Sequence, residues 1–122
     1  MPQVFVYGSL KRNHRDRPHF NRGLMEREGA EFVEDMVLEL PLKMYNMGYF
    51  PALVPSPAEM HIITGEVYNI TDELLKVLDR IEGHPTHYRR EQYPKYLGEA
   101  WVYIRPTLNP DFQFDHIASG VW

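Results

Sequence analysis

One segment of this chain has the complete pattern of an α-helix, whereas the other patterned segments are typical of β-strands. Thr71 is placed to cap the start of this helix and Gly83 to cap its end. Between them, residues 72–82 carry apolar side chains at three- and four-residue spacing, namely Leu74, Leu75, Leu78 and Ile81. One amphipathic helix among many strands predicts an α+β fold in which the helix lies against a sheet.

Five segments have the alternation, or the β-branched and aromatic content, of strands. Residues 4–7 form an apolar run that ends at Gly8, which is typical of a strand buried on both faces at the centre of a sheet. The other predicted strands are residues 30–40, 61–70, 87–93 and 99–105. Gly65 indicates a bulge or a close backbone approach within its strand. The expected architecture is a small, twisted, partly closed mixed β-barrel with the one main helix against an opening.

The length of 122 residues, with no repeat or linker, predicts a single domain over residues 1–122. The prolines at positions 51, 55 and 57 indicate an irregular loop within it. No apolar segment is long enough for a membrane span and the N-terminus does not resemble a signal peptide, so we expect a cytoplasmic protein.

Composition excludes several function classes. A net charge of −4 is unfavourable for binding nucleic acid or an anionic membrane, so we expect a small-molecule or protein partner. The absence of cysteine excludes disulfides, thiolate metal ligands and cysteine nucleophiles. The six histidines are not paired at the spacing of a zinc-binding helix, and we expect no metal site.

Glu82 is the first candidate for chemistry. It follows Leu78 by four residues, along the apolar stripe and at the C-terminal end of the predicted helix. Burial there, near the negative end of the helix dipole, predicts a raised pKa, which suits a general acid–base. Two other interpretations remain open from the spacing: a solvent-exposed glutamate, or a structural ion pair with Arg89 or Arg90.

The turn after the first strand is the second candidate. It reads Tyr7, Gly8, Ser9 and Leu10, and a basic stretch follows. A glycine at the end of a buried strand allows several backbone N–H groups to converge on a carboxylate or phosphate. One glycine is too few for a P-loop or a dinucleotide site, and Ser9 lacks the setting of a serine nucleophile. A purely structural turn also fits these residues.

Three motifs taken together resemble a known family. They are VYGSLK at residues 6–11, GEVY at residues 65–68 and LDRIEGHP at residues 78–85, the last followed by YRR at residues 88–90. In this order and spacing they resemble the gamma-glutamylcyclotransferase-like proteins, and most closely the gamma-glutamylamine cyclotransferases. The resemblance extends from Gln3 to about Ile104.

The resemblance implies an enzyme without a cofactor that acts on a small-molecule gamma-glutamyl substrate. The α-amine of the glutamyl group attacks its own γ-carbonyl, which yields 5-oxoproline and a free amine or amino acid. Glu82 matches the family's acid–base carboxylate. The family's substrate-binding loop corresponds to Tyr7, Gly8, Ser9 and Leu10, and Tyr88 matches an aromatic residue near the site.

The chain departs from the family pattern at one edge of this loop. Ser9 replaces the more usual threonine, and the basic stretch at residues 11–22 lacks a glycine that often follows the motif. The hydroxyl is retained, so the departure leaves open the choice of leaving amine rather than the chemistry. A catalytically silent small-molecule-binding module on the same fold is the alternative to an enzyme.

Overall fold

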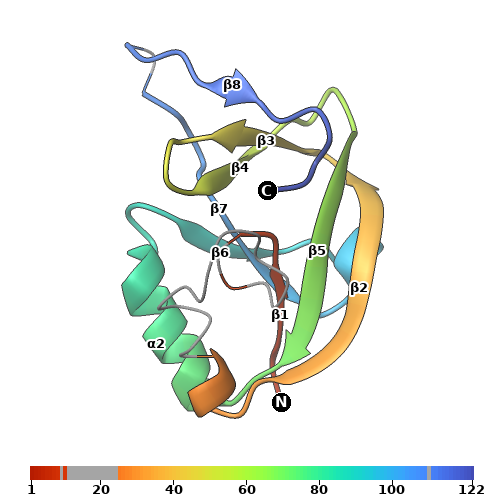
Figure 1. Cartoon of the computed structure of the whole chain (residues 1–122), viewed down its shortest axis with the longest axis vertical. Helices are drawn as coiled ribbons and strands as arrows, with labels where there is room; N and C mark the ends of the chain where they lie inside the picture. The colour runs from red at the N-terminus through yellow and green to blue at the C-terminus, as the bar shows by residue number, and fades with distance from the viewer. Residues whose placement is uncertain (9, 11–24, 110) are drawn as a thin grey trace.

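The computed structural model describes residues 1–8, 10, 25–109 and 111–122. Ser9 and the basic stretch at residues 11–22 lie outside the described residues. Two sheets, a main helix packed on one of them and a short second helix make up the described fold (Figure 1). In chain order the elements are β1 (Gln3–Val6), β2 (Glu31–Leu40), β3 (Leu42–Asn46), β4 (Pro51–Pro55), β5 (His61–Asn69), α2 (Asp72–Glu82), β6 (Arg89–Gln92), α3 (Pro94–Leu97), β7 (Trp101–Ile104) and β8 (Asp115–His116).

β1 is the central strand of the five-stranded sheet, whose order is β2-β5-β1-β7-β6. It pairs antiparallel with β5 and parallel with β7, so the sheet is mixed. Val4 and Val6 pack in one core cluster, while Phe5 and Tyr7 pack in a second cluster on the other face. This confirms the prediction of a central strand buried on both faces, which the uninterrupted apolar run requires.

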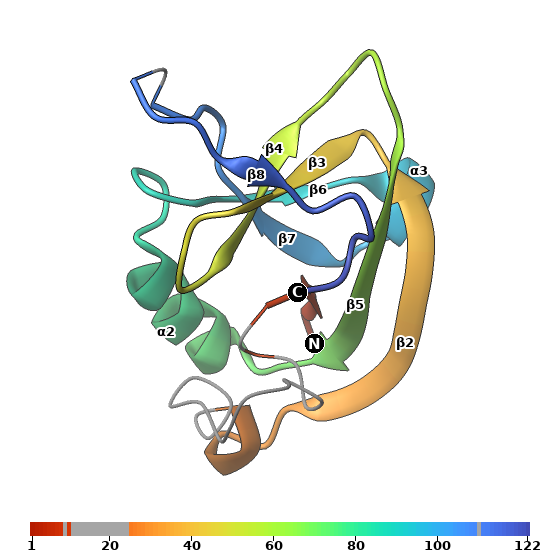
Figure 2. The ribbon, with the colours of Figure 1, turned by 45° about the horizontal axis from the view of Figure 1, so that its top comes forward.

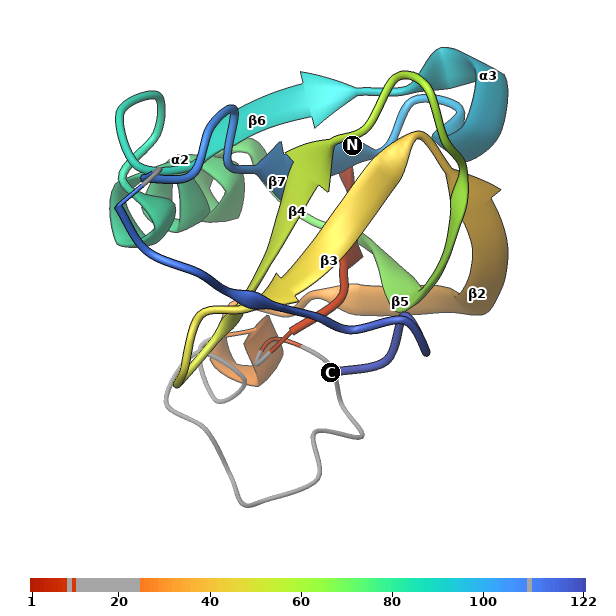
Figure 3. The ribbon, with the colours of Figure 1, turned by 90° about the horizontal axis from the view of Figure 1, so that it is seen from above.

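The two sheets are joined through the β2–β3 connection and a backbone hydrogen bond, without closing into a full barrel. Strand β2 leads through Pro41 into β3, the middle strand of the second sheet, whose order is β4-β3-β8 (Figure 2). Beyond the end of β7, the backbone N–H of Arg105 donates to the carbonyl of Leu53 in β4 at 2.9 Å. Seen from above, β3 and β4 lie across β5 and β7 (Figure 3). The predicted α+β, partly closed mixed architecture is therefore confirmed.

The prediction of an irregular loop at the prolines is wrong for residues 51–55, which form β4. Pro51 lies opposite Asn46 and Pro55 opposite Leu42 in an antiparallel hairpin with β3, a strand that the sequence analysis did not identify. Proline is tolerated here because β4 is an edge strand of its sheet and the two prolines stand at its ends. The hairpin matters because its turn forms one wall of the candidate site.

The helix α2 spans the residues predicted for it. The Thr71 hydroxyl accepts a hydrogen bond from the N–H of Leu74 at 3.0 Å, and Gly83 ends the helix with a φ of 69°. Leu74 and Leu78 are fully buried in the first core cluster, together with Val4 and Val6 of β1. The helix thereby holds its last turn beside the C-terminal end of β1. In the described parts of the chain, no helix is long and apolar enough to cross a membrane.

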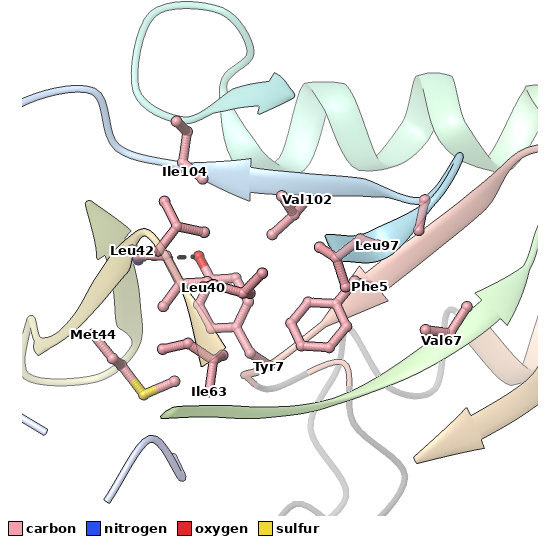
Figure 4. Close-up of a cluster of buried hydrophobic side chains, with 12 residues drawn as sticks. Phe5, Tyr7, Leu40, Leu42, Met44, Ile63, Val67, Leu97, Val102 and Ile104 are labelled. Atoms are coloured by element: carbon pink, nitrogen blue, oxygen red, sulfur yellow. Dashed lines mark hydrogen bonds between the residues drawn. The ribbon is translucent and has the colours of Figure 1, made fainter. Parts of the chain in front are cut away.

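The second core cluster fills the space between the two sheets (Figure 4). Gly65 lies beside it, and a Cβ added there would be 2.5 Å from Cζ of Phe5 and 2.6 Å from the carbonyl oxygen of Val6. The close approach predicted for this glycine is thus confirmed. The bulge occurs instead in β2, between Phe32 and Glu34, where the register with β5 shifts.

Candidate active site

A cavity of about 420 Å³ opens beside the C-terminal end of β1. Its walls come from segments that are far apart in the sequence: the end of β1, the β3–β4 turn, the last turn of α2, the segment after it and the end of β7. The described lining residues are Phe5, Val6, Tyr7, Gly8, Leu10, Tyr49, Phe50, Pro51, Ile81, Glu82, His87, Tyr88, Tyr103 and Arg105. The volume is within the range of small-molecule sites.

Glu82 lies in this cavity, and its partial burial raises the pKa of its carboxyl group from 4.5 to about 7. The structural ion pair considered from the sequence does not form. Arg89 pairs with Glu91 at 2.6 Å, and Arg90 pairs with Asp79 at 2.9 Å. Among the described residues, no hydrogen bond or ion pair engages the Glu82 carboxylate, so it is available to a ligand.

Three tyrosines hold the cavity walls together through their hydroxyl groups. Tyr7 donates to the carbonyl of Tyr103 at 2.6 Å, and it also accepts from the N–H of Leu53 at 3.4 Å (Figure 4). Tyr88 donates to the carbonyl of Pro51 at 2.9 Å, and Tyr103 donates to Asp79 at 2.7 Å. Burial raises the pKa of all three phenols. They therefore remain neutral and connect β1, β4, α2 and β7 around the cavity.

Asp79 anchors the last turn of α2, three residues before Glu82. Arg90 donates to both of its carboxylate oxygens, at 2.9 and 3.1 Å, and the Arg90 guanidinium lies 4.2 Å from the centroid of the Trp101 ring. Burial tends to raise the pKa of Asp79, but the hydrogen bonds from Arg90 and Tyr103 hold it below its usual value. This network fixes the helix end relative to β6 and β7.

The predicted substrate turn is only partly described. Tyr7, Gly8 and Leu10 line the cavity together with Glu82 and Tyr88, so these five predicted site residues share one cavity. Gly8 has no positive φ. A Cβ at this position would lie 3.0 Å from Cγ of Pro51, a tight contact that a side chain could make only if Pro51 shifted. Ser9, the remaining residue of the predicted turn, lies outside the described residues.

Two groups of lining residues were missed by the sequence analysis. Tyr49 and Phe50 lie in the turn before β4, for which no prediction was made, and Pro51 begins the segment that was predicted as an irregular loop. Tyr103 and Arg105 lie in the last part of the strand predicted at residues 99–105, and the alternation of that strand places both on the face that carries Trp101. That alternation was a usable signal for Arg105, which stands two residues beyond Tyr103.

The histidines do not assemble a metal centre in the described part of the chain. His84 accepts a hydrogen bond through Nδ1 from the N–H of Arg90 at 3.0 Å, and His87 is exposed at the cavity. The rings of His61 and His116 lie 5.1 Å apart, away from the cavity lining. Within the described residues, no group of three or more His, Asp or Glu side chains is placed to hold a metal ion.

Comparisons with known proteins identify the family of the chain. Residues 4–122 match the family model described as gamma-glutamyl cyclotransferase, AIG2-like. A Mus musculus protein named gamma-glutamylaminecyclotransferase is 33% identical over 129 residues, which covers 93% of this chain and 85% of the mouse protein. The solution structure of the Escherichia coli protein YtfP has a TM-score of 0.70 at 28% identity, covering 98% of this chain and 95% of YtfP. The chain therefore belongs to the AIG2-like gamma-glutamyl cyclotransferase family.

Proposed function

We propose that this protein is a gamma-glutamylcyclotransferase that converts a gamma-glutamyl amine or amino acid into 5-oxoproline and the free amine, with Glu82 as the general acid–base. The observation that carries the proposal is the Glu82 carboxyl group, which is unpaired among the described residues and lies in the cavity with a pKa raised to about 7. A pKa near the working pH suits a group that must both accept and donate a proton. Membership of the family supplies the substrate class.

The proposed reaction is an internal transfer of an acyl group. The Glu82 carboxylate takes a proton from the substrate's α-ammonium group, and the freed nitrogen lone pair attacks the γ-carbonyl carbon. The new C–N bond closes the five-membered ring. The bond from the γ-carbon to the leaving nitrogen then breaks as protonated Glu82 returns its proton to that nitrogen, and the ring nitrogen gives its second proton to the Glu82 carboxylate, which leaves the neutral lactam. One bond forms and one breaks, and no oxidant or reductant is required.

The remaining predicted site residues are proposed to bind the glutamyl end. Backbone groups of the turn formed by Tyr7, Gly8, Ser9 and Leu10 would hold its α-carboxylate. The Tyr88 hydroxyl is already engaged with Pro51, so Tyr88 would contribute its ring as a wall. The N–H of Tyr88 donates to the carbonyl of Glu82 at 3.2 Å, which keeps that wall beside the acid–base group.

The pH dependence tests the state of Glu82. The proton acceptor is the carboxylate, so kcat/KM should rise as pH increases through about 7 and level off above it. An unperturbed glutamate would place this limb near 4.5. Initial rates of 5-oxoproline formation between pH 4 and pH 8 measure its position, and an acid limb below pH 5 would contradict the assignment of Glu82.

Substitution of Gly8 tests the substrate turn. In Gly8→Val, the added side chain meets Pro51 and occupies the cavity wall where the glutamyl end is proposed to bind. We expect its affinity for a gamma-glutamyl amine to fall by about 10-fold or more, whereas Ser9→Ala, which removes only a hydroxyl, should lower it by about 3-fold or less. Isothermal titration in a Glu82→Gln background measures both. Equal affinities for the Gly8→Val and parent proteins would show that the glutamyl end binds elsewhere.

A substrate screen separates an enzyme from a silent binding module. Gamma-glutamyl amines, gamma-glutamyl amino acids and glutathione would each be assayed for 5-oxoproline release and for their effect on the melting temperature. Release of 5-oxoproline from any of them supports the proposal. A raised melting temperature without product would instead indicate a binding module, in which Glu82 only contacts the ligand.

A further inference from the structure

Asp79 and Arg90 form a mostly buried ion pair beside the cavity, and the proposed reaction makes no use of it. Each of the two side chains is only 19% exposed, so water screens their charges weakly. Arg90 donates from Nε and Nη2 to the two carboxylate oxygens of Asp79, at 2.9 and 3.1 Å. Neither residue belongs to the described lining of the cavity. Opposite charges this close largely cancel for a third group, so the pair acts on its surroundings as a nearly neutral unit.

Glu82 lies within electrostatic reach of this pair. Asp79 and Glu82 are three residues apart on α2, so their Cβ atoms are about 5–6 Å apart. They also share a neighbour, Tyr103. Burial is the largest influence that raises the pKa of the Tyr103 phenol; the hydrogen bond and charge of Asp79 and the charge of Glu82 add to the rise, whereas the Arg90 charge opposes it. The pKa of Glu82 itself is raised by burial, as expected beside a neutral pair.

Each member of the pair has a second partner that holds it in place. The Arg90 guanidinium lies 4.2 Å from the centroid of the Trp101 ring, and the N–H of Arg90 donates to Nδ1 of His84 at 3.0 Å. The Asp79 carboxylate accepts a hydrogen bond from the Tyr103 hydroxyl at 2.7 Å, and the Asp79 carbonyl accepts one from the N–H of His84 at 2.9 Å. Removal of one charge therefore leaves the other in place and uncompensated.

We propose that Asp79 is a positioning residue for Glu82: it holds Arg90 in a neutral pair at the last turn of α2, so that Glu82 exchanges its proton without the influence of a net charge there. An uncompensated Arg90 would stabilise the Glu82 carboxylate and make it a weaker base. An uncompensated Asp79 would destabilise the carboxylate and keep more of Glu82 protonated. This inference rests on the proposed function and assigns the electrostatic control of its acid–base group.

The other titratable and charged groups that surround Glu82 are the same in the variants that test this proposal. Those of the described cavity lining are Tyr7, Tyr49, His87, Tyr88, Tyr103 and Arg105. Burial keeps the phenols of Tyr7, Tyr88 and Tyr103 neutral, and an arginine keeps its charge. A histidine, by contrast, can titrate in the same range as Glu82. The comparison is therefore repeated in His87→Gln and in His84→Asn, because His84 contacts both members of the pair.

The test follows the ionisation of Glu82 in two ways. One is the acid limb of kcat/KM for a gamma-glutamyl amine, and the other is the ¹³C NMR titration of the carboxyl signal that is absent from Glu82→Gln. Both midpoints should move down by about half a pH unit or more in Asp79→Asn and up by a similar amount in Arg90→Gln. The double variant should return to the parent midpoint. Glu91→Gln, which breaks the neighbouring ion pair of β6 with Arg89, should not move it.

Opposite shifts that cancel in the double variant support the inference. Shifts in the same direction, or unchanged midpoints, would overturn it, because a purely structural pair would change activity or stability without reversing the sign. If Asp79→Asn is unfolded by circular dichroism, the upward shift in Arg90→Gln decides. If the parent protein turns over no gamma-glutamyl compound, the proposed function fails, and the NMR midpoints still test whether the pair controls the Glu82 charge.

Discussion

Replacing Glu82 by glutamine should lower kcat/KM for gamma-glutamyl substrates by about 100-fold or more, the usual scale for a positioned acid–base group. Glutamine has nearly the same shape but can neither take the proton from the α-ammonium nor return it to the leaving amine. The carboxylate makes no hydrogen bond to a described residue, so the substitution removes no structural contact. Release of 5-oxoproline under saturating and limiting substrate measures the loss.

The same variant should keep its stability, and the sign of the effect depends on pH. The pKa of Glu82 is about 7 in the folded protein and 4.5 when the side chain is not buried, as in the unfolded chain. Glu82 therefore binds its proton more tightly in the folded protein than in the unfolded chain. Its contribution to the free energy of unfolding is fully present below pH 4.5 and is lost as pH rises through about 7. At pH 8 we expect Glu82→Gln to melt at or above the temperature of the parent protein.

Glu73 provides the matched control for this experiment. It is an exposed glutamate in the first turn of the same helix, away from the cavity lining. Glu73→Gln should leave both the turnover and its pH profile as they are. If Glu82→Gln turns over substrate like the parent protein, Glu82 is not the acid–base group, and a Glu82→Gln protein that is unfolded by circular dichroism would contradict the stability part of the prediction.

Gly65→Ala should destabilise the fold by about 3 kcal/mol, at the upper end of the range for overpacked cores. The new methyl group would lie 2.5 Å from Cζ of Phe5 and 2.6 Å from the carbonyl oxygen of Val6. The Val6 oxygen belongs to the backbone of the central strand, and Phe5 is almost fully buried, so neither can move without disturbing the sheet. Urea unfolding measures the free energy, and the melting temperature should fall by about 10 °C.

Gly29→Ala separates this steric effect from the loss of a glycine. Gly29 has a φ of 72° with open space around it, so alanine there costs only the left-handed backbone strain, about 1–2 kcal/mol. Gly65 has no positive φ, and its cost arises from contact alone. A Gly65→Ala protein as stable as the parent would show that β1 and β5 do not approach as closely as the structure indicates.

Local patterns were sufficient where neighbouring residues determine the structure. The caps at Thr71 and Gly83 delimit α2, because they satisfy backbone groups that belong to the helix itself. The apolar run at residues 4–7 places β1 at the sheet centre, since only a central strand covered on both faces buries consecutive apolar side chains. The partial burial of Glu82 likewise follows from its position one turn after Leu78 on the buried stripe.

Contacts between distant segments were decided only by the tertiary structure. The residues at positions 51–55 pair as a strand because β3 offers them a partner, whereas their prolines alone favour a loop. Asp79, rather than Glu82, takes Arg90, because Tyr103 donates to the same carboxylate and the α2–β6 connection brings the guanidinium there. Arg105 enters the cavity only once β7 is docked between β1 and β6. Sequence periodicity assigns a side chain to one face of its strand, but which residues of other segments lie near that side chain depends on how the sheet is assembled.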